Sequence, residues 1–210
     1  MKTPIFAFIA AGSYLIPSGF GIRYWRVLST PMKIFALFST YSVLHEIVAI
    51  VLGRMGISNH FLSNIYVVTF IECILFLYSK WTDRQFLKDG FRIAGLMYFV
   101  FWTIDVSFSP FPKEFRENID TVANAIALVT SVIILSQLIK YSKKSIVEYS
   151  VFWIAIGTLL YSAGTIIIFS FSNTILSMGI NYFNMLWHIN WGFTIIANVL
   201  YARSFWCKTF

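Results

Sequence analysis

The stretch TVANAIALVTSVIILSQLI, residues 121–139, contains no aspartate, glutamate, lysine or arginine. About 20 apolar residues in a helix are enough to cross the hydrocarbon core of a bilayer, because each residue adds about 1.5 Å of length. This stretch is therefore predicted to be a transmembrane helix, and the sequence on both sides of it repeats the same pattern.

Six further apolar runs are present, at residues 4–21, 32–52, 61–79, 91–108, 150–169 and 182–202. Turn-forming pairs such as Thr30-Pro31 and Asp89-Gly90 separate several of these runs. No break exceeds about 15 residues, which leaves no room for a soluble catalytic or DNA-binding domain. We predict an all-α polytopic membrane protein, a seven-transmembrane-helix bundle that forms a single transmembrane domain over residues 1–210.

The composition agrees with a lipid environment. Hydrophobic residues make up 58% of the chain and charged residues 12%, whereas soluble domains have about 45 to 50% apolar and about 25% charged residues. The net charge of +7 does not indicate nucleic-acid binding, because the lysines and arginines lie almost entirely between the apolar runs.

These basic residues predict the orientation, because positively charged loops stay in the cytoplasm. One side of the predicted bundle has only four: Lys2, Arg54, Lys113 and Arg116. The other side has 12: Arg23, Arg26, Lys33, Lys80, Arg84, Lys88, Arg92, Lys140, Lys143, Lys144, Arg203 and Lys208. The N-terminus is therefore predicted to lie outside and the C-terminus in the cytoplasm, and we expect a plasma membrane, of the bacterial inner-membrane type.

Ionisable side chains within the apolar runs are the strongest functional signal, because such groups are costly in hydrocarbon and usually face the bundle interior. Five occur here: His45, Glu46, Glu72, Asp105 and His188. At about 1.5 Å per residue, all five fall within about 16 Å of the outer ends of their helices. This shared depth predicts a polar cavity that opens outward, lined by the second, third, fourth, fifth and seventh spans.

Helical periodicity adds polar and aromatic neighbours to this cluster. Asn184, His188 and Trp191 share one face of the last span, and Asp120 and Asn124 share one face of the fifth. The candidate ligand-binding residues are His45, Glu46, Glu72, Asp105, Asn124, Asn184, His188 and Trp191. The simpler interpretation of the same residues is an interhelical hydrogen-bond network that fixes packing and binds nothing.

Cofactor chemistry is an alternative for the same cluster. His45, Glu72 and His188 could supply three zinc ligands, and the two histidines could ligate a haem. Neither His-x-x-x-His nor His-Glu-x-x-His occurs, so no cofactor is predicted and no catalytic residue is assigned. Covalent retinal is not expected, because the last span carries Asn198 and no lysine at its middle.

The pattern favours a small sensor or receptor-like module. It would bind a small ligand or a proton in the outer cavity and signal through a membrane or cytoplasmic partner, because the chain has no effector domain of its own. A membrane-embedded metal-dependent hydrolase or haem protein is the first alternative, and a small-solute transporter is the second. We expect contact with the lipid bilayer and no nucleic-acid partner. Whether the chain forms a homo-oligomer is left open.

Overall fold

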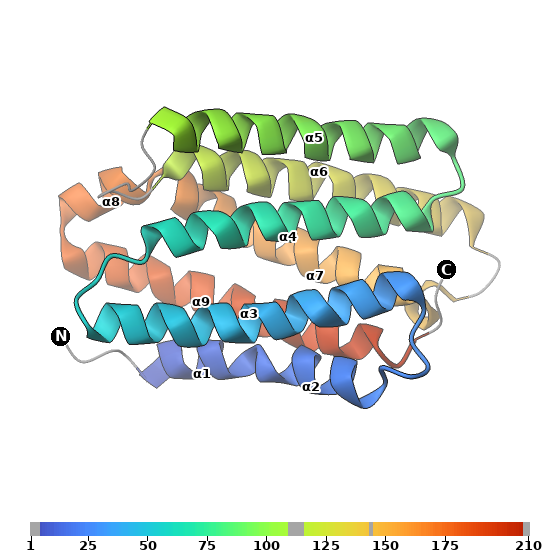
Figure 1. Ribbon diagram of the computed structural model, residues 1–210, viewed down its shortest axis with the longest axis horizontal. Helices are drawn as coiled ribbons and strands as arrows, with labels where there is room; N and C mark the ends of the chain where they lie inside the picture. Colours follow the sequence, from blue (N-terminus) through green and yellow to red (C-terminus); the bar gives the residue numbers. More distant parts are fainter. Residues whose placement is uncertain (1–4, 109–115, 143–144, 208–210) are drawn as a thin grey trace.

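Long helices run side by side along one axis of the molecule (Figure 1). The computed structural model describes residues 5–108, 116–142 and 145–207, without the side chains of residues 180, 181 and 183. The long helices within these ranges are α3 (Thr30–Arg54), α4 (His60–Trp81), α5 (Gln85–Phe108), α6 (Glu117–Tyr141), α7 (Ser150–Ser170) and α9 (Ile180–Ser204). Two shorter helices, α1 (Ile5–Ser13) and α2 (Leu15–Arg23), together form one further rod, and the described residues contain no strand.

Six of these segments are long and apolar enough to cross a membrane: the α1–α2 rod, α3, α4, α5, α6 and α7. The predicted all-helical, multi-pass membrane architecture is confirmed at this level. Helix α9 is 25 residues long but is not among the six. Its polar residues lower its hydropathy, and among them are Asn184, His188, Asn190 and Asn198.

The first predicted run is one helix in the sequence pattern but two helices in the structure. Helix α1 ends at Ser13 and α2 begins at Leu15, with Tyr14 between them. Pro17 is the cause, because it has no backbone N–H to donate to the Ser13 carbonyl four residues earlier. The Ser13 hydroxyl donates instead to the Ala10 carbonyl oxygen, at 2.6 Å. The break places Tyr14 inside the bundle, at the cavity described below.

A short helix that the hydropathy pattern did not predict, α8 (Ser172–Met178), connects α7 to α9. Gly179 follows it with a φ of 130°, a conformation that only glycine adopts without strain. Helix α8 lies at the same end of the bundle as the N-terminus (Figure 1). We call this end the N-terminal end and the opposite end, where the C-terminus lies, the C-terminal end.

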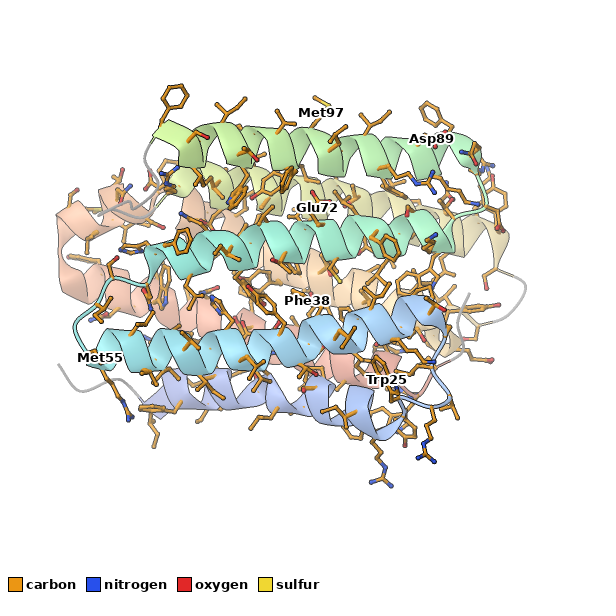
Figure 2. The ribbon with its side chains drawn as sticks, in the orientation of Figure 1. Trp25, Phe38, Met55, Glu72, Asp89 and Met97 are labelled. Carbon is orange, nitrogen blue, oxygen red and sulfur yellow. The ribbon has the colours of Figure 1, made fainter. Side chains whose placement is uncertain are left out.

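Helix α4 is central and α5 is peripheral. In the apolar 18-residue stretch of α4, half of the residues are buried, compared with 17% in the corresponding stretch of α5. The core around α4 contains the fully buried side chains of Phe35, Ile71, Tyr78 and Ile154. On the outer face of α5, Met97 points away from the bundle (Figure 2) and is 67% exposed. Helix α5 therefore presents an apolar face to its surroundings, as a lipid-facing helix would.

The described basic residues separate between the two ends of the bundle. Arg54 ends α3 and Arg116 immediately precedes α6, both at the N-terminal end. The others lie at the C-terminal end: Arg23, Arg26, Lys33, Lys80, Arg84, Lys88, Arg92, Lys140 and Arg203. Lys2, Lys113, Lys143, Lys144 and Lys208 lie outside the described residues.

Candidate ligand cavity

A cavity of about 510 Å³ extends from the N-terminal end of the bundle past its middle as far as Tyr201 of α9, with walls from α1, α2, α3, α4, α6, α7, α8 and α9. This volume is in the range of about 300 to 1,000 Å³ that is usual for small-molecule sites. Helix α5 contributes no lining residue. The prediction that the fourth span lines the cavity is therefore wrong, and the first and sixth spans, α1–α2 and α7, line it instead.

Aromatic side chains form much of the wall: Tyr14, Phe38, Tyr66, Phe70, Tyr161, Phe169, Trp187, Trp191 and Tyr201. Several are held by one another. The Tyr66 ring lies 4.6 Å from the His45 ring and 6.2 Å from the Tyr41 ring, centroid to centroid. Trp187 meets Phe169 edge to face, with centroids 6.0 Å apart. Such contacts between rings restrict side-chain motion, which produces a preformed wall.

The polar part of the wall centres on α6, where Asp120 and Asn124 lie one turn apart. The Asn124 side-chain amide donates to the Asp120 carbonyl oxygen at 2.8 Å, and its oxygen accepts from the Thr165 hydroxyl at 3.3 Å. Asp120 is only 3% exposed, yet its Oδ2 has no hydrogen-bond partner among the described residues. The same holds for Asn190 Oδ1 and His45 Nε2, which belong to two other cavity-lining residues.

Unpaired groups of this kind matter energetically. A buried donor or acceptor without a partner costs about 1 to 3 kcal/mol. Asp120, Asn190 and His45 come from α6, α9 and α3, so the three groups surround the cavity from different helices. A single small molecule within the cavity could satisfy groups from more than one helix.

The cavity also has a distinct charge character. Two carboxylates line it, Glu46 and Asp120, and no lysine or arginine is among its described lining residues. Neither carboxylate forms a salt bridge within the part of the chain that the structure describes. The remaining ionisable lining groups are His45 and His60.

Four of the eight candidate ligand-binding residues line the cavity: His45, Glu46, Asn124 and Trp191. Asn184 and His188 lie beside it and are not part of the lining. The His188 Nδ1 contacts the Asn184 carbonyl oxygen at 2.5 Å. The His188 ring is parallel to that of Phe6, with centroids 6.0 Å apart, and lies 4.9 Å from the Trp191 ring. His188 therefore supports the wall from behind.

The other two candidates, Glu72 and Asp105, lie away from the cavity. Glu72 lies between α4 and α5 (Figure 2), where its Oε2 is 2.8 Å from the position that a Cβ on Gly95 would occupy. Asp105 forms a salt bridge with Arg116 at the N-terminal end. Glu72 follows the cavity-lining Phe70 by two residues, which is about 200° around the helix. Residue number places Glu72 along its helix, but it does not give the direction in which the side chain points.

Two buried polar residues of the cavity with unpaired oxygens, Asp120 and Asn190, were absent from the candidate set. Asp120 directly precedes the apolar run at residues 121–139, so it was not counted as an intramembrane acid. Its spacing to Asn124, one helical turn, was the available signal, since it places both on one face. Asn190 lies between Ile189 and Trp191, with no spacing that separates it from a packing residue.

The three residues suggested as zinc ligands, His45, Glu72 and His188, do not form a common centre. Among the described residues, no group of three His, Cys, Asp or Glu side chains is arranged to hold a metal ion. His45 packs on Tyr66 of α4, His188 packs on Phe6 of α1, and Glu72 faces α5. No protein-family model, curated protein or solved structure matches this chain. The inference about function therefore depends on the chemistry of the cavity.

Proposed function

We propose that this chain is a sensor or receptor-like membrane protein that binds a small ligand in the cavity and transmits a change in helix packing to a partner. The observation that carries this proposal is the cavity itself. It has a volume of about 510 Å³ and is lined by residues of eight helices, and three of these helices carry unpaired buried polar groups. A bundle whose polar residues served packing alone would bring them into contact with one another, since unpaired buried groups are destabilising.

The proposal includes α9 as a seventh span. Its 25 residues would extend about 37 Å, longer than the roughly 30 Å hydrocarbon core. Asn190 and Asn198 are buried toward the cavity, so they lower the hydropathy of the helix without facing lipid. The exposed side chains of α9 are apolar over most of its length and include Met185, Ile189, Ile196 and Val199.

The proposal also includes an outward N-terminal end, in a plasma membrane of the bacterial inner-membrane type. The gathering of described basic residues at the C-terminal end supports this orientation, because basic loops remain cytoplasmic. The cavity would then open outward, and a bound small ligand or proton would be sensed from outside the cell.

Two buried hydroxyl pairs offer a connection from the cavity to the C-terminal end. Tyr201 lines the cavity, and its hydroxyl lies 3.1 Å from that of Thr158 on α7. The hydroxyls of Tyr78 on α4 and Ser131 on α6 are 2.8 Å apart. A ligand that moves α9 would alter packing against α7, and a membrane or cytoplasmic partner at the C-terminal end would detect the change.

Accessibility of adjacent positions on α3 tests whether the cavity opens outward. Ala49 lines the cavity, whereas Val48 faces away and is 45% exposed on the bundle surface. In a Cys207→Ser background, we expect Ala49→Cys to react with a membrane-impermeant charged thiosulfonate added outside intact cells. Val48→Cys, at nearly the same depth, should remain unreactive in lipid. Equal protection of both cysteines would contradict an outward-opening, water-accessible cavity.

Ligand binding is tested by thermal unfolding of the purified protein in nanodiscs against chemically varied small molecules. A true cavity ligand should raise the unfolding temperature of the parent protein and fail to do so for Ala123→Leu, which fills the lining. Ala123 is 1% exposed and lines the cavity, while the adjacent Val122, at 36% exposed, does not. Val122→Leu is therefore the matched control and should keep the response.

A small-solute transporter is the second candidate, favoured by a second pocket of about 200 Å³. It is lined by residues that include Trp81, Arg84, Gln137 and Tyr141, and it lies near the C-terminal end. Transport would require the intervening layer around Tyr78 to open. Uptake of a cavity ligand into sealed proteoliposomes would favour the transporter over the sensor, and binding without uptake would favour the sensor.

A further inference from the structure

We infer that the ligand of the cavity is a small organic cation, an ammonium group carried on an apolar body. This inference rests on the proposed function in one respect, that the cavity binds a small molecule. It adds the chemical class of that molecule, which follows from the charge, hydrogen-bond character and aromatic content of the wall.

The first argument is charge. Asp120 is 3% exposed and lacks a salt-bridge partner among the described residues, and Glu46 lacks one as well. With no lysine or arginine in the described lining, no permanently charged basic side chain balances these two carboxyl groups. A cationic ligand would supply the missing charge, whereas an anionic ligand would add a third negative group to the same cavity. Like charges at short range repel one another.

The second argument is hydrogen-bond character. Asp120 Oδ2 and Asn190 Oδ1 are buried oxygens without partners in the described chain, and both belong to the lining. When ionised, a carboxylate only accepts hydrogen bonds, as an amide oxygen does, so the site requires donors. An ammonium group offers up to three donors and no acceptor. A bond between ammonium and carboxylate is roughly twice as strong as one between neutral groups.

The third argument is the aromatic wall. Tyr161 of α7 lines the cavity together with Asp120, and Trp187 and Trp191 line it from α9. The faces of such rings attract ammonium groups, and aromatic cages with a nearby acid are a recurrent solution for binding organic cations. The same rings would contact the apolar body of the ligand. An inorganic cation has no apolar body, so the aromatic wall favours an organic cation.

A purely structural role for Asp120 makes a different prediction. Asp120 lies in the first helical turn of α6, where the free backbone N–H groups and the helix dipole stabilise a negative charge. If this were its whole role, replacing Asp120 would alter the stability of the protein but not the ligand preference of the cavity. Ligand preference is therefore the quantity to measure.

The experiment compares three compounds of similar size: phenethylamine, phenethyl alcohol and phenylpropionate. They carry a cationic, a neutral and an anionic group on the same aromatic body. Binding to the full-length protein in neutral-lipid nanodiscs would be measured by titration calorimetry at pH 7. We expect phenethylamine to bind at least about tenfold more tightly than the alcohol, which corresponds to one charge-assisted hydrogen bond. We expect no binding of phenylpropionate.

Asp120→Asn should remove the amine preference, so that the amine and the alcohol bind within about twofold of each other. Glu72→Gln is the matched control, because Glu72 is an intramembrane carboxyl group that does not line the cavity. It should keep the full preference. If Asp120→Asn fails to fold, Glu46→Gln removes the other lining carboxylate, and the amine preference should fall by a smaller factor.

Three results would overturn the inference: equal binding of amine and alcohol to the parent protein, preference for the anion, or no binding of any of the three compounds. An amine preference that survives in Asp120→Asn would overturn it as well. Each of these is distinguishable from failure of the proposed function. If Ala49→Cys reacts from outside the cell and a neutral compound stabilises the protein, the proposal of a binding cavity is supported. Only the inference of a cationic ligand is then rejected.

Discussion

The side-chain amide of Asn198 on α9 donates a hydrogen bond to Ser13 Oγ on α1 at 2.8 Å and so joins these two helices. Both side chains are buried, at 3% and 5% exposure. The Ser13 hydroxyl also donates to the Ala10 carbonyl oxygen, so its oxygen acts as acceptor for Asn198 and donor to α1. This pair connects α1 and α9 at the edge of the cavity, where both helices contribute lining residues.

We predict that Asn198→Ala lowers the free energy of unfolding by about 0.6 kcal/mol, the average for interhelical hydrogen bonds in a membrane protein, and by no more than about 1.7 kcal/mol, the maximum measured for such bonds. Ser13→Ala should lower it as well, because it leaves the buried Asn198 side-chain amide without this acceptor. Reversible unfolding in bicelles would provide the values, and a double-mutant cycle would give the coupling. Additive effects of the two substitutions would show that the hydrogen bond does not contribute to stability.

Close approach of α2 and α3 depends on Gly21. A Cβ at this position would lie 2.7 Å from the Ala36 Cβ and 3.1 Å from the Ala36 Cα, so the helix backbones themselves would have to separate. We predict that Gly21→Ala destabilises the protein by about 1 to 3 kcal/mol, as overpacking does. Gly19→Ala on the same helix is the control, because a Cβ there meets no atom within 4 Å. Equal thermal unfolding of the two variants would contradict the close packing.

The helical segments were predictable because hydrocarbon imposes one strong requirement, a long apolar run. The runs at residues 121–139 and 150–169 correspond to Glu117–Tyr141 and Ser150–Ser170. Most helices extend past the apolar runs, and some carry a basic residue in the last turn, such as Arg54 and Arg203, where a positive charge is favourable. The break at Tyr14 was visible in principle from Pro17, but hydropathy alone does not detect a single missing hydrogen bond.

The candidate site was less predictable, for a geometric reason. Depth along a helix follows from residue number, but the direction of a side chain depends on how the whole bundle is packed. His45 and Glu72 are both intramembrane ionisable residues, yet one lines the cavity and the other faces α5. Hydropathy did not indicate the peripheral position of α5, because α5 has the lowest hydropathy of the six apolar segments.

Glu72 provides a test of this distinction. Its Oε1 is buried and has no hydrogen-bond partner among the described residues. We predict that Glu72→Met raises the free energy of unfolding by about 1 kcal/mol, because it removes an unsatisfied polar group and keeps the side-chain length. Binding of cavity ligands should not change. A loss of about 3 to 5 kcal/mol would instead indicate that Glu72 balances a buried positive charge.

The two cysteines test the orientation of the bundle without any substitution. Cys73 is buried in α4, whereas Cys207 follows α9 at the C-terminal end and is partly exposed. A membrane-impermeant maleimide should therefore leave this protein unlabelled in intact cells. Once the membrane is permeabilised, the reagent should label one thiol, Cys207. Labelling of Cys207 in intact cells would contradict a cytoplasmic C-terminus.

The rate of this labelling should depend on pH in a predictable direction. Burial raises the pKa of the Cys207 thiol above its usual value, and the nearby Arg203 guanidinium opposes this shift only in part. The thiolate is the reactive form, so a raised pKa means a smaller reactive fraction at pH 7 and slower labelling than for a free thiol. The rate should keep rising with pH beyond about 8.5, where a free cysteine is half ionised. Arg203→Gln should shift the curve to still higher pH, because it removes a positive charge that stabilises this thiolate.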